Sequence, residues 1–156
     1  MGDAVLGRYP ARPARLPELR RAFLHESRRR WGSPESPCPI LGLAPGGECW
    51  GLAFDVPPAD RRLVVRAIEK REAADERRRE TRSAETPEGP VEAWVWVSRR
   101  ADGGGGTDLE RIESGLRAAH GVVGTGTEYV RTLVHAMDLH GIKDPLVETL
   151  WNRLRS

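Results

Sequence analysis

The sequence has almost no lysine, only two cysteines and no long apolar run. Lys70 and Lys143 are the only lysines, so arginine supplies nearly all of the positive charge, and the formal net charge is +2. A chain this close to charge balance gives no electrostatic reason to expect a nucleic-acid or membrane partner. No apolar segment approaches the roughly 20 residues that a membrane-spanning helix needs. We therefore expect neither kind of partner.

The two cysteines, Cys38 and Cys49, are too few for a disulfide framework, and the N-terminus has no signal-peptide pattern. They are expected to be free thiols in a soluble, cytoplasmic protein. At 156 residues the chain is long enough to bury a core without cross-links. The sequence thus predicts a single domain over residues 1–156.

Strand-forming apolar segments predict strands at residues 23–26, 40–43, 49–56 and 91–97. The intervening loop 44–48, Ala-Pro-Gly-Gly-Glu, predicts a hairpin between the second and third of these. The first twenty residues contain Pro10, Pro13 and Pro17 and are expected to be irregular. Residues 75–88 are charged and contain no large apolar residue, so no element is assigned to them, and residues 87–90 predict a turn.

Helical spacing predicts that the second half of the chain is mostly helical. An earlier helix is expected after Pro57-Pro58, with an apolar face made of Leu63, Val64, Ala67 and Ile68. Asp108, Thr127 and Asp144 are the expected N-caps of three later helices. The glycine run 103–106 is expected to be a flexible connector. Because strands come first and helices later, the order favours an α+β fold over regular βαβ alternation.

Most reactive residue types lack the pattern that their chemistry needs. The four histidines have no metal-ligand spacing, and His135 and His140 are five residues apart, on different faces of one helix. The glycine run is not followed by the lysine of a phosphate loop. Neither cysteine has an adjacent base or helix N-terminus that would make it a thiolate. The sequence therefore predicts no metal and no cofactor.

Glu72 is the best candidate for a reacting group. It closes the run 67–72, at or just past the end of the first predicted helix. Taken alone, a glutamate beside Lys70 and Arg71 is most often part of a surface ion pair. The order of the surrounding motifs favours a catalytic role instead.

Several short motifs follow one another in the order of a known family. They are Arg21-Ala22-Phe23, Gly32-Ser33-Pro34, residues 41–56 with the glycines Gly46, Gly47 and Gly51, Lys70-Arg71-Glu72, Ala118-Ala119-His120-Gly121, Gly124, Glu128-Tyr129-Val130 and residues 141–145. This order resembles the ChaC-type γ-glutamylcyclotransferases, which are specific for glutathione. The resemblance runs from about residue 13 to the C-terminus. It implies an α+β fold with a small, mostly antiparallel sheet or open barrel and flanking helices.

The resemblance also implies a reaction and two site residues. In this family the α-amine of the substrate attacks its own γ-glutamyl carbonyl, which releases 5-oxoproline and Cys-Gly from glutathione. Glu72 would be the catalytic general base, and Tyr129 would line the pocket and bind the substrate. For Tyr129 the alternative, a core aromatic on a helix face, stays open. The implied partner is a small γ-glutamyl compound, and no cofactor is implied.

The chain departs from the family pattern at several positions. The family's first strand carries a Tyr-Gly-Ser-Leu loop, and this sequence contains none. After the glutamate the family has Gly-Gly-Tyr-Arg, whereas this chain has Ala74-Asp75-Glu76-Arg77, and Gly126 replaces an asparagine. We therefore expect 5-oxoproline release only when the missing strand is supplied. The alternatives are a catalytically degenerate relative that binds a γ-glutamyl compound or a protein and, more distantly, an arginine-rich nucleic-acid binder.

Overall fold

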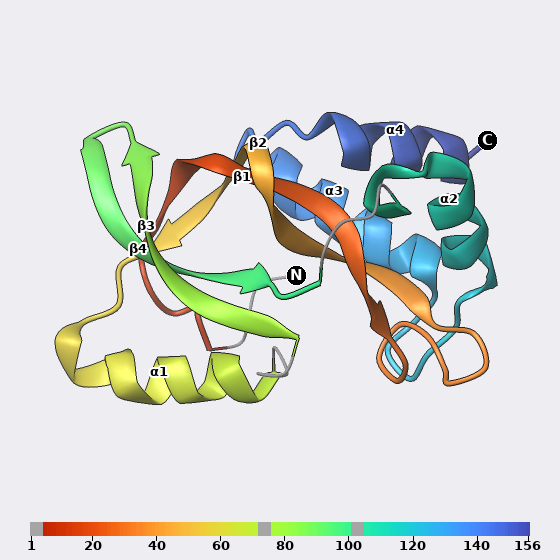
Figure 1. The fold of residues 1–156 in the computed structure, drawn as a ribbon, viewed down its shortest axis with the longest axis horizontal. Coiled ribbons are helices and arrows are strands. Elements are labelled where there is room, and N and C mark those ends of the chain that lie inside the picture. The colour runs from red at the N-terminus through yellow and green to blue at the C-terminus, as the bar shows by residue number, and fades with distance from the viewer. Residues whose placement is uncertain (1–4, 72–75, 101–104) are drawn as a thin grey trace.

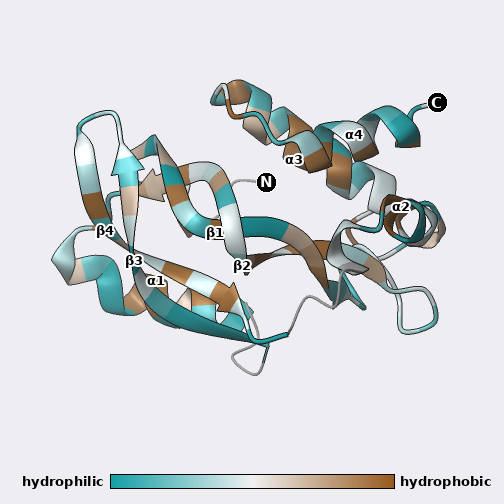
Figure 2. Cartoon of the chain, turned by 45° about the horizontal axis from the view of Figure 1, so that its top comes forward, coloured by the Kyte–Doolittle hydropathy of each residue, from teal (hydrophilic) through white to brown (hydrophobic). Residues whose placement is uncertain are grey.

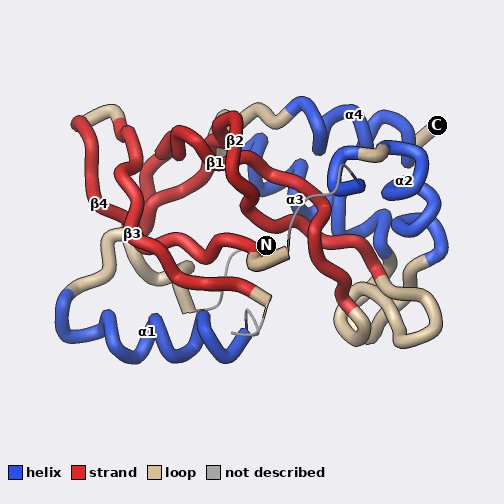
Figure 3. The backbone as a smooth tube through the Cα atoms, in the orientation of Figure 1, coloured by secondary structure: helices blue, strands red, loops and turns tan. Residues whose placement is uncertain are grey.

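The computed structural model describes residues 5–71, 76–100 and 105–156, in which strands come first and most helices later (Figure 1). The elements in chain order are β1 (Ala11–Ser27), β2 (Cys38–Phe54), α1 (Pro58–Arg71), β3 (Arg77–Thr86), β4 (Gly89–Ser98), the 3-10 turn η1 (Gly105–Thr107), α2 (Leu109–Ala118), α3 (Gly126–Leu139) and α4 (Pro145–Leu154). Helices α2, α3 and α4 gather at one end of the strands, and α1 lies apart from them (Figure 3). The predicted α+β class is confirmed.

The sheet consists of two long antiparallel hairpins in the order β2-β1-β3-β4. The first hairpin is paired from Ala11↔Phe54 to Ser27↔Cys38, and the second from Arg77↔Ser98 to Thr86↔Gly89. Within the described residues the two hairpins share one ladder pair, Arg15↔Glu85. The sheet is therefore open along most of the seam between β1 and β3, and the hairpins diverge there (Figure 1).

Strand β1 is much longer than predicted, and the expectation of an irregular start was wrong. Pro13 and Pro17 both lie inside the strand. Proline lacks the N–H that a central strand needs, but it is tolerated on a strand edge and at bulges. The edge of β1 that faces β3 has a single ladder pair, and the register shifts between Pro17 and Leu19, where Glu18 has a φ of 63°. The prolines are thus accommodated by the open seam and the bulge.

The predicted hairpin at residues 44–48 is also wrong, because β2 continues through it as one strand. Gly46 and Gly47 have φ values of 90° and 76°, which favour glycine. They lie opposite Glu18, so both strands bulge at the same place and pairing resumes at Pro17↔Glu48. The glycine pair therefore bends a continuous ladder instead of reversing the chain.

Strand β3 had no signal in the sequence because nearly all of its side chains are polar. Its backbone is nevertheless paired along its whole length with β4, the strand predicted at residues 91–97. The predicted turn at 87–90 joins them, with Gly89 at a φ of 115°. Arg79 of β3 stacks over Trp94 of β4 at 5.0 Å and pairs with Glu69 of α1 at 3.6 Å. Backbone pairing and these surface contacts stabilise a strand that apolar periodicity does not reveal.

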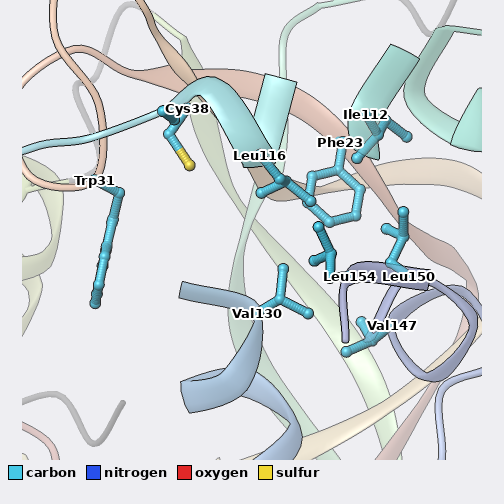
Figure 4. Close-up of a cluster of buried hydrophobic side chains, with 10 residues drawn as sticks. Phe23, Trp31, Cys38, Ile112, Leu116, Val130, Val147, Leu150 and Leu154 are labelled. Carbon is cyan, nitrogen blue, oxygen red and sulfur yellow. The ribbon is translucent and has the colours of Figure 1, made fainter. Parts of the chain in front are cut away.

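The main core lies between the β1–β2 hairpin and helices α2, α3 and α4 (Figure 4). Phe23 of β1 lies among the helix residues Ile112, Leu116 and Leu150 (Figure 4). A smaller cluster, formed by Leu19, Val95 and Val97, lies between the two hairpins.

The helix faces follow the predicted spacing, with one exception. The apolar segments of α3 and α4 alternate with polar ones, as expected of helices with one buried face (Figure 2). On α1, Val64 and Ile68 are buried as predicted, but Leu63 is 61% exposed. No helix in the described part of the chain is long and apolar enough to cross a membrane.

Two of the three predicted helix caps are confirmed. Asp108 accepts from the backbone N–H of Arg111, and Asp144 accepts from those of Leu146 and Val147. The third prediction, Thr127, is wrong, because α3 begins two residues earlier in the chain, with Thr125 as its N-cap. The backbone N–H of Glu128 donates to Thr125 Oγ1 at 3.1 Å, and the Glu128 carboxylate accepts from the Thr125 N–H at 2.8 Å. This reciprocal pair is a capping box.

Replacing Thr125 with alanine is expected to lower the free energy of unfolding by about 1 kcal/mol, because one backbone donor of α3 loses its acceptor. Thr127→Ala is the matched control, two residues away inside the helix, and is expected to change stability by less than about 0.5 kcal/mol. Urea unfolding of both variants is the measurement. Equal losses in the two variants would contradict the capping box.

Candidate functional site

The predicted base, Glu72, lies outside the residues that the structure describes. The description stops at Arg71, the last residue of α1, and resumes at Glu76, next to the start of β3. The catalytic role of Glu72 therefore stays a prediction. The other predicted site residue, Tyr129, and the neighbourhood of Glu76 are both described.

Tyr129 lies in the first turn of α3, just after the capping box. Its ring is tilted by 50° against that of Trp31, with ring centroids 5.7 Å apart. Its hydroxyl oxygen accepts a hydrogen bond of 3.0 Å from the backbone N–H of Leu41 in β2. The side chain is half-buried. Tyr129 thus packs at the edge of the core and holds α3 against β2, and its proposed contact with a substrate is untested.

The Leu41 peptide is the point where three elements meet. Its N–H is bound by Tyr129 of α3, and its carbonyl accepts a long hydrogen bond of 3.4 Å from Nη2 of Arg77, the first residue of β3. The following residue, Gly42, lies against the ring of His25. Residues of α3, β3 and β1 therefore lie around residues 41 and 42 of β2. They include Tyr129, a predicted site residue, and Arg77, which follows Glu72 in the chain by five positions.

Buried His25 and half-buried Glu76 form a pair beside this peptide. Nδ1 of His25 lies 2.9 Å from Oε2 of Glu76, and the His25 side chain is 0% exposed. The other carboxylate oxygen of Glu76 accepts from Nη2 of Arg100 at 2.7 Å. The two residues are 51 positions apart in the chain, so no local pattern in the sequence predicts their contact. Sequence reasoning had set His25 aside with the other histidines.

The pKa shifts of the pair define its protonation state. Burial lowers the pKa of His25, and the charge of Arg77 lowers it further, outweighing the opposite effect of Glu76. Burial alone would raise the pKa of Glu76, but the hydrogen bond from His25 and the charge of Arg100 prevail and lower it. Both shifts favour a neutral imidazole beside a carboxylate. Nδ1 then carries the proton that is donated to Glu76, and Nε2 carries the lone pair.

The buried neutral histidine makes stability depend on pH. In the unfolded chain His25 takes up a proton below its ordinary pKa of about 6.5, whereas the folded chain resists protonation. The unfolded state then binds more protons, so we expect stability to fall as the pH drops below about 6.5, with a slope approaching 1.4 kcal/mol per pH unit.

Urea unfolding between pH 5 and pH 7 measures this slope, and His25→Asn is expected to flatten it. His135→Asn, which replaces an exposed histidine on α3, is the control and should leave the slope unchanged. A slope that survives in the His25 variant would show that another group is responsible.

The remaining nucleophile candidates and a surface groove lie elsewhere. Burial raises the pKa of the Cys38 thiol to about 12 and also raises that of Cys49, so neither is a thiolate at neutral pH. A groove of about 620 Å³ between α2 and α4 contains Glu113, which pairs with both Arg117 and Arg153. It shares no residue with the surroundings of Leu41. Among the described side chains, no group of three or more His, Cys, Asp or Glu could hold a metal ion.

The fold is that of the γ-glutamylcyclotransferases. The structure is similar to a crystal structure of a γ-glutamyl cyclotransferase specific to glutathione from yeast, with a TM-score of 0.78 and 14% identity over 96% of this chain and 90% of that chain. A second crystal structure of a yeast γ-glutamyl cyclotransferase specific to glutathione gives a TM-score of 0.73 and 15% identity over 96% and 91% of the two chains. At these identities the likeness defines the fold alone.

The family itself is defined by sequence. A sequence model of the family described as ChaC-like protein matches residues 9–156, and the chain belongs to this family. No curated protein matches the chain.

Proposed function

We propose that this protein is a γ-glutamylcyclotransferase that acts on glutathione, with Glu72 as its general base. The observation that carries the proposal is the match to the ChaC-like family over residues 9–156. The fold shared with a yeast enzyme specific to glutathione supports it. The collinear motifs, from Arg21 to residue 145, support it independently of the fold.

The reaction needs little from the protein beyond shape and a proton carrier. The α-amine of the γ-glutamyl group forms a bond to the γ-carbonyl carbon, the bond from that carbon to the cysteine nitrogen breaks, and a five-membered lactam is released. Because nucleophile and electrophile belong to one molecule, folding the substrate into its reactive shape supplies much of the acceleration. A base must take a proton from the attacking nitrogen and return it to the departing one. A carboxylate with a raised pKa can do both.

Tyr129 is the described residue that we place at the substrate. It lies at the meeting point around Leu41, whose N–H donates to the Tyr129 hydroxyl and whose carbonyl accepts from Arg77, the first residue of β3. Arg77 brings a guanidinium to the same peptide, and a guanidinium suits the carboxylates that glutathione carries. In this role Tyr129 would orient the substrate, while its hydrogen bond to Leu41 fixes its own position.

We further propose that the domain takes one more strand, the one that carries the family's Tyr-Gly-Ser-Leu loop. Backbone N–H groups in such a loop would bind the γ-carbonyl oxygen as negative charge develops on it. The seam between β1 and β3 supports this proposal, because the described residues form a single ladder pair there. Strand edges with so little pairing are where an added strand gains backbone hydrogen bonds.

The test is release of 5-oxoproline from glutathione, followed by mass spectrometry. The present chain and a chain extended by a strand containing Tyr-Gly-Ser-Leu are compared, and other γ-glutamyl dipeptides are offered as competing substrates. We expect turnover of glutathione by the extended chain and little by the present one. No release from any γ-glutamyl compound by either chain would refute the proposal.

The second candidate is a non-catalytic relative that binds a γ-glutamyl compound or a protein. The observation that favours it is the lack of the glycine-loop sequence in this chain. Tight binding of glutathione by the extended chain, without product, would support this candidate.

A further inference from the structure

The positive charge of the chain is concentrated on α1. The formal net charge of the whole chain is only +2, yet α1 alone has five basic residues against two acidic ones. Of the acidic residues, Asp60 accepts a hydrogen bond of 3.0 Å from the Tyr9 hydroxyl, and Glu69 pairs with Arg79 of β3 at 3.6 Å. Both carboxylates of the helix are therefore bound to other segments. The charge balance of the whole chain does not describe this helix.

The face of α1 opposite its buried side is basic. Val64 and Ile68 are the buried residues of the helix. With 3.6 residues per turn, Arg62, Arg66 and Lys70 recur at intervals of four residues on the opposite face. All three are exposed, and none forms an ion pair with another described residue. We call this row of unpaired cations the α1 stripe.

Two loops elsewhere in the chain combine unpaired arginines with exposed valines. Arg29 and Arg30 begin the loop that follows β1, are exposed, and also lack an ion pair within the described residues. The backbone N–H groups of Val122 and Val123 donate to the carbonyls of Arg29 and Arg30 at 2.9 and 2.8 Å, so the loop at 119–125 lies against the first. Val122 is 77% exposed and Val123 is 48% exposed. Backbone hydrogen bonds thus hold two apolar side chains in solvent beside two cations.

Few acidic side chains offset the charge of these loops. Glu35 is the only acidic residue in the ranges 28–37 and 119–125. Glu26, at the end of β1, pairs with Arg28 at 2.8 Å and so leaves Arg29 and Arg30 unneutralised. The loops therefore have a net positive charge.

The α1 stripe and the two loops belong to one edge of the molecule. In Figure 1, α1 forms the lower edge at the left and the loops 28–37 and 119–125 form it at the right, whereas α4 lies along the upper edge. A plane seen edge-on along the lower edge meets both parts. One flat surface can therefore touch α1 and both loops at the same time.

The apolar side chains distinguish the possible partners. The phosphates of a nucleic acid would attract the cations, but they would leave Val122, Val123 and Leu63 in water. Leu63 lies beside the α1 stripe and is 61% exposed. An anionic bilayer attracts arginine and lysine to its headgroups and also takes up apolar side chains at the boundary between headgroups and acyl chains. A bilayer is also flat over the length of this edge.

We propose that this edge is a docking surface for an anionic phospholipid membrane. The α1 stripe, Arg29 and Arg30 bind the headgroups, and Val122 and Val123 enter the boundary below them. The net charge of the sequence led us to expect no membrane partner, and that criterion fails here because the charge is segregated on one edge. The docking surface does not depend on the proposed activity.

Sedimentation with lipid vesicles tests the charge. We expect the full chain to bind vesicles of phosphatidylcholine and phosphatidylserine but not vesicles of phosphatidylcholine alone, and to be released by salt, which screens exposed charges. Replacing Arg62 and Arg66 together with glutamine is expected to lower the partition coefficient roughly 30-fold, or about fivefold for each cation removed.

The matched control is the double replacement of Lys143 and Arg155 with glutamine. These exposed residues flank α4 on the opposite edge, and their loss changes the net charge by the same amount. Because they lie away from the docking surface, the partition coefficient should stay within about threefold of the wild type. Equal losses in the two double variants would overturn the proposal, as would no binding to the anionic vesicles.

A second pair of variants tests the lipid boundary. Replacing Val122 and Val123 together with serine is expected to lower the partition coefficient about tenfold, the equivalent of burying roughly two methylene groups less, and to leave its salt dependence unchanged. Leu139→Ser, which removes a 68% exposed apolar side chain at the end of α3, is the control and should have no effect. If the valine variant binds vesicles as the wild type does, or if a DNA duplex binds the protein more tightly than the vesicles do, the membrane is the wrong partner.

Discussion

Replacing Glu72 with glutamine is expected to lower kcat for 5-oxoproline release by about 10²–10⁴-fold, the usual contribution of a positioned general acid–base group. Glutamine has nearly the same size as glutamate but cannot take up the proton of the attacking amine. Because substrate shape and binding are left intact, KM should change much less than kcat. The measurement is steady-state turnover of glutathione by the chain that shows activity.

The matched control is Glu69→Gln on α1, three positions earlier in the sequence. Glu69 is 42% exposed and pairs with Arg79 at 3.6 Å, as a surface glutamate does. Its replacement removes the same charge three positions away in the chain and should leave kcat within about twofold. A Glu72→Gln enzyme as active as the wild type would show that the base is another group, and His25 would then be the first to examine.

Local patterns in the sequence predicted the elements whose side chains repeat with a clear period. Strand β4 alternates and was predicted close to its observed bounds, and α2 and α4 were predicted with the aspartate caps that they have. Strand β3 was missed because its stability comes from backbone pairing with β4, which does not depend on apolar side chains. Local signals thus fail where an element is held by its neighbours.

The glycine and proline signals were present but were assigned to the wrong structures. Gly46 and Gly47 mark a bulge opposite Glu18, although the same residues usually mark a turn. A bulge and a turn both need positive φ, and only the partner strand distinguishes them. The same limit applies to the prolines of β1, which are tolerated because the seam beside them is open.

The candidate site shows most clearly what local sequence patterns cannot predict. The motif order gave the family, and Tyr129 lies where α3, β2 and β3 meet. The pairs that shape the surroundings are remote in sequence, such as His25 with Glu76, 51 positions apart, and Arg21 with Asp144, 123 apart. Arg21 and Asp144 are 2.9 Å apart and join β1 to the start of α4. Contacts of this kind follow from the completed fold and not from any local pattern.

Gly126→Asn, which restores the residue that the family has at this position, is expected to lower the free energy of unfolding by about 3 kcal/mol, at the upper end of the range for overpacked cores. Gly126 is the first residue of α3 and is buried. A Cβ there would lie 2.3 Å from the carbonyl oxygen and 2.8 Å from the Cα of Leu116. These are backbone atoms of α2, which cannot move aside without shifting the whole helix.

Because the clash begins at Cβ, Gly126→Ala is expected to be nearly as destabilising as Gly126→Asn. Gly51→Ala is the control, since its Cβ would meet only Nη2 of Arg21 at an ordinary 3.5 Å, and its effect should stay below about 1 kcal/mol. Urea unfolding of the three variants is the measurement. A Gly126→Asn protein as stable as the wild type would mean that α2 and α3 can separate at little cost. The predicted loss means instead that these helices pack more closely than the family's asparagine allows, so restoring that one residue cannot restore the family's site unless α2 moves as well.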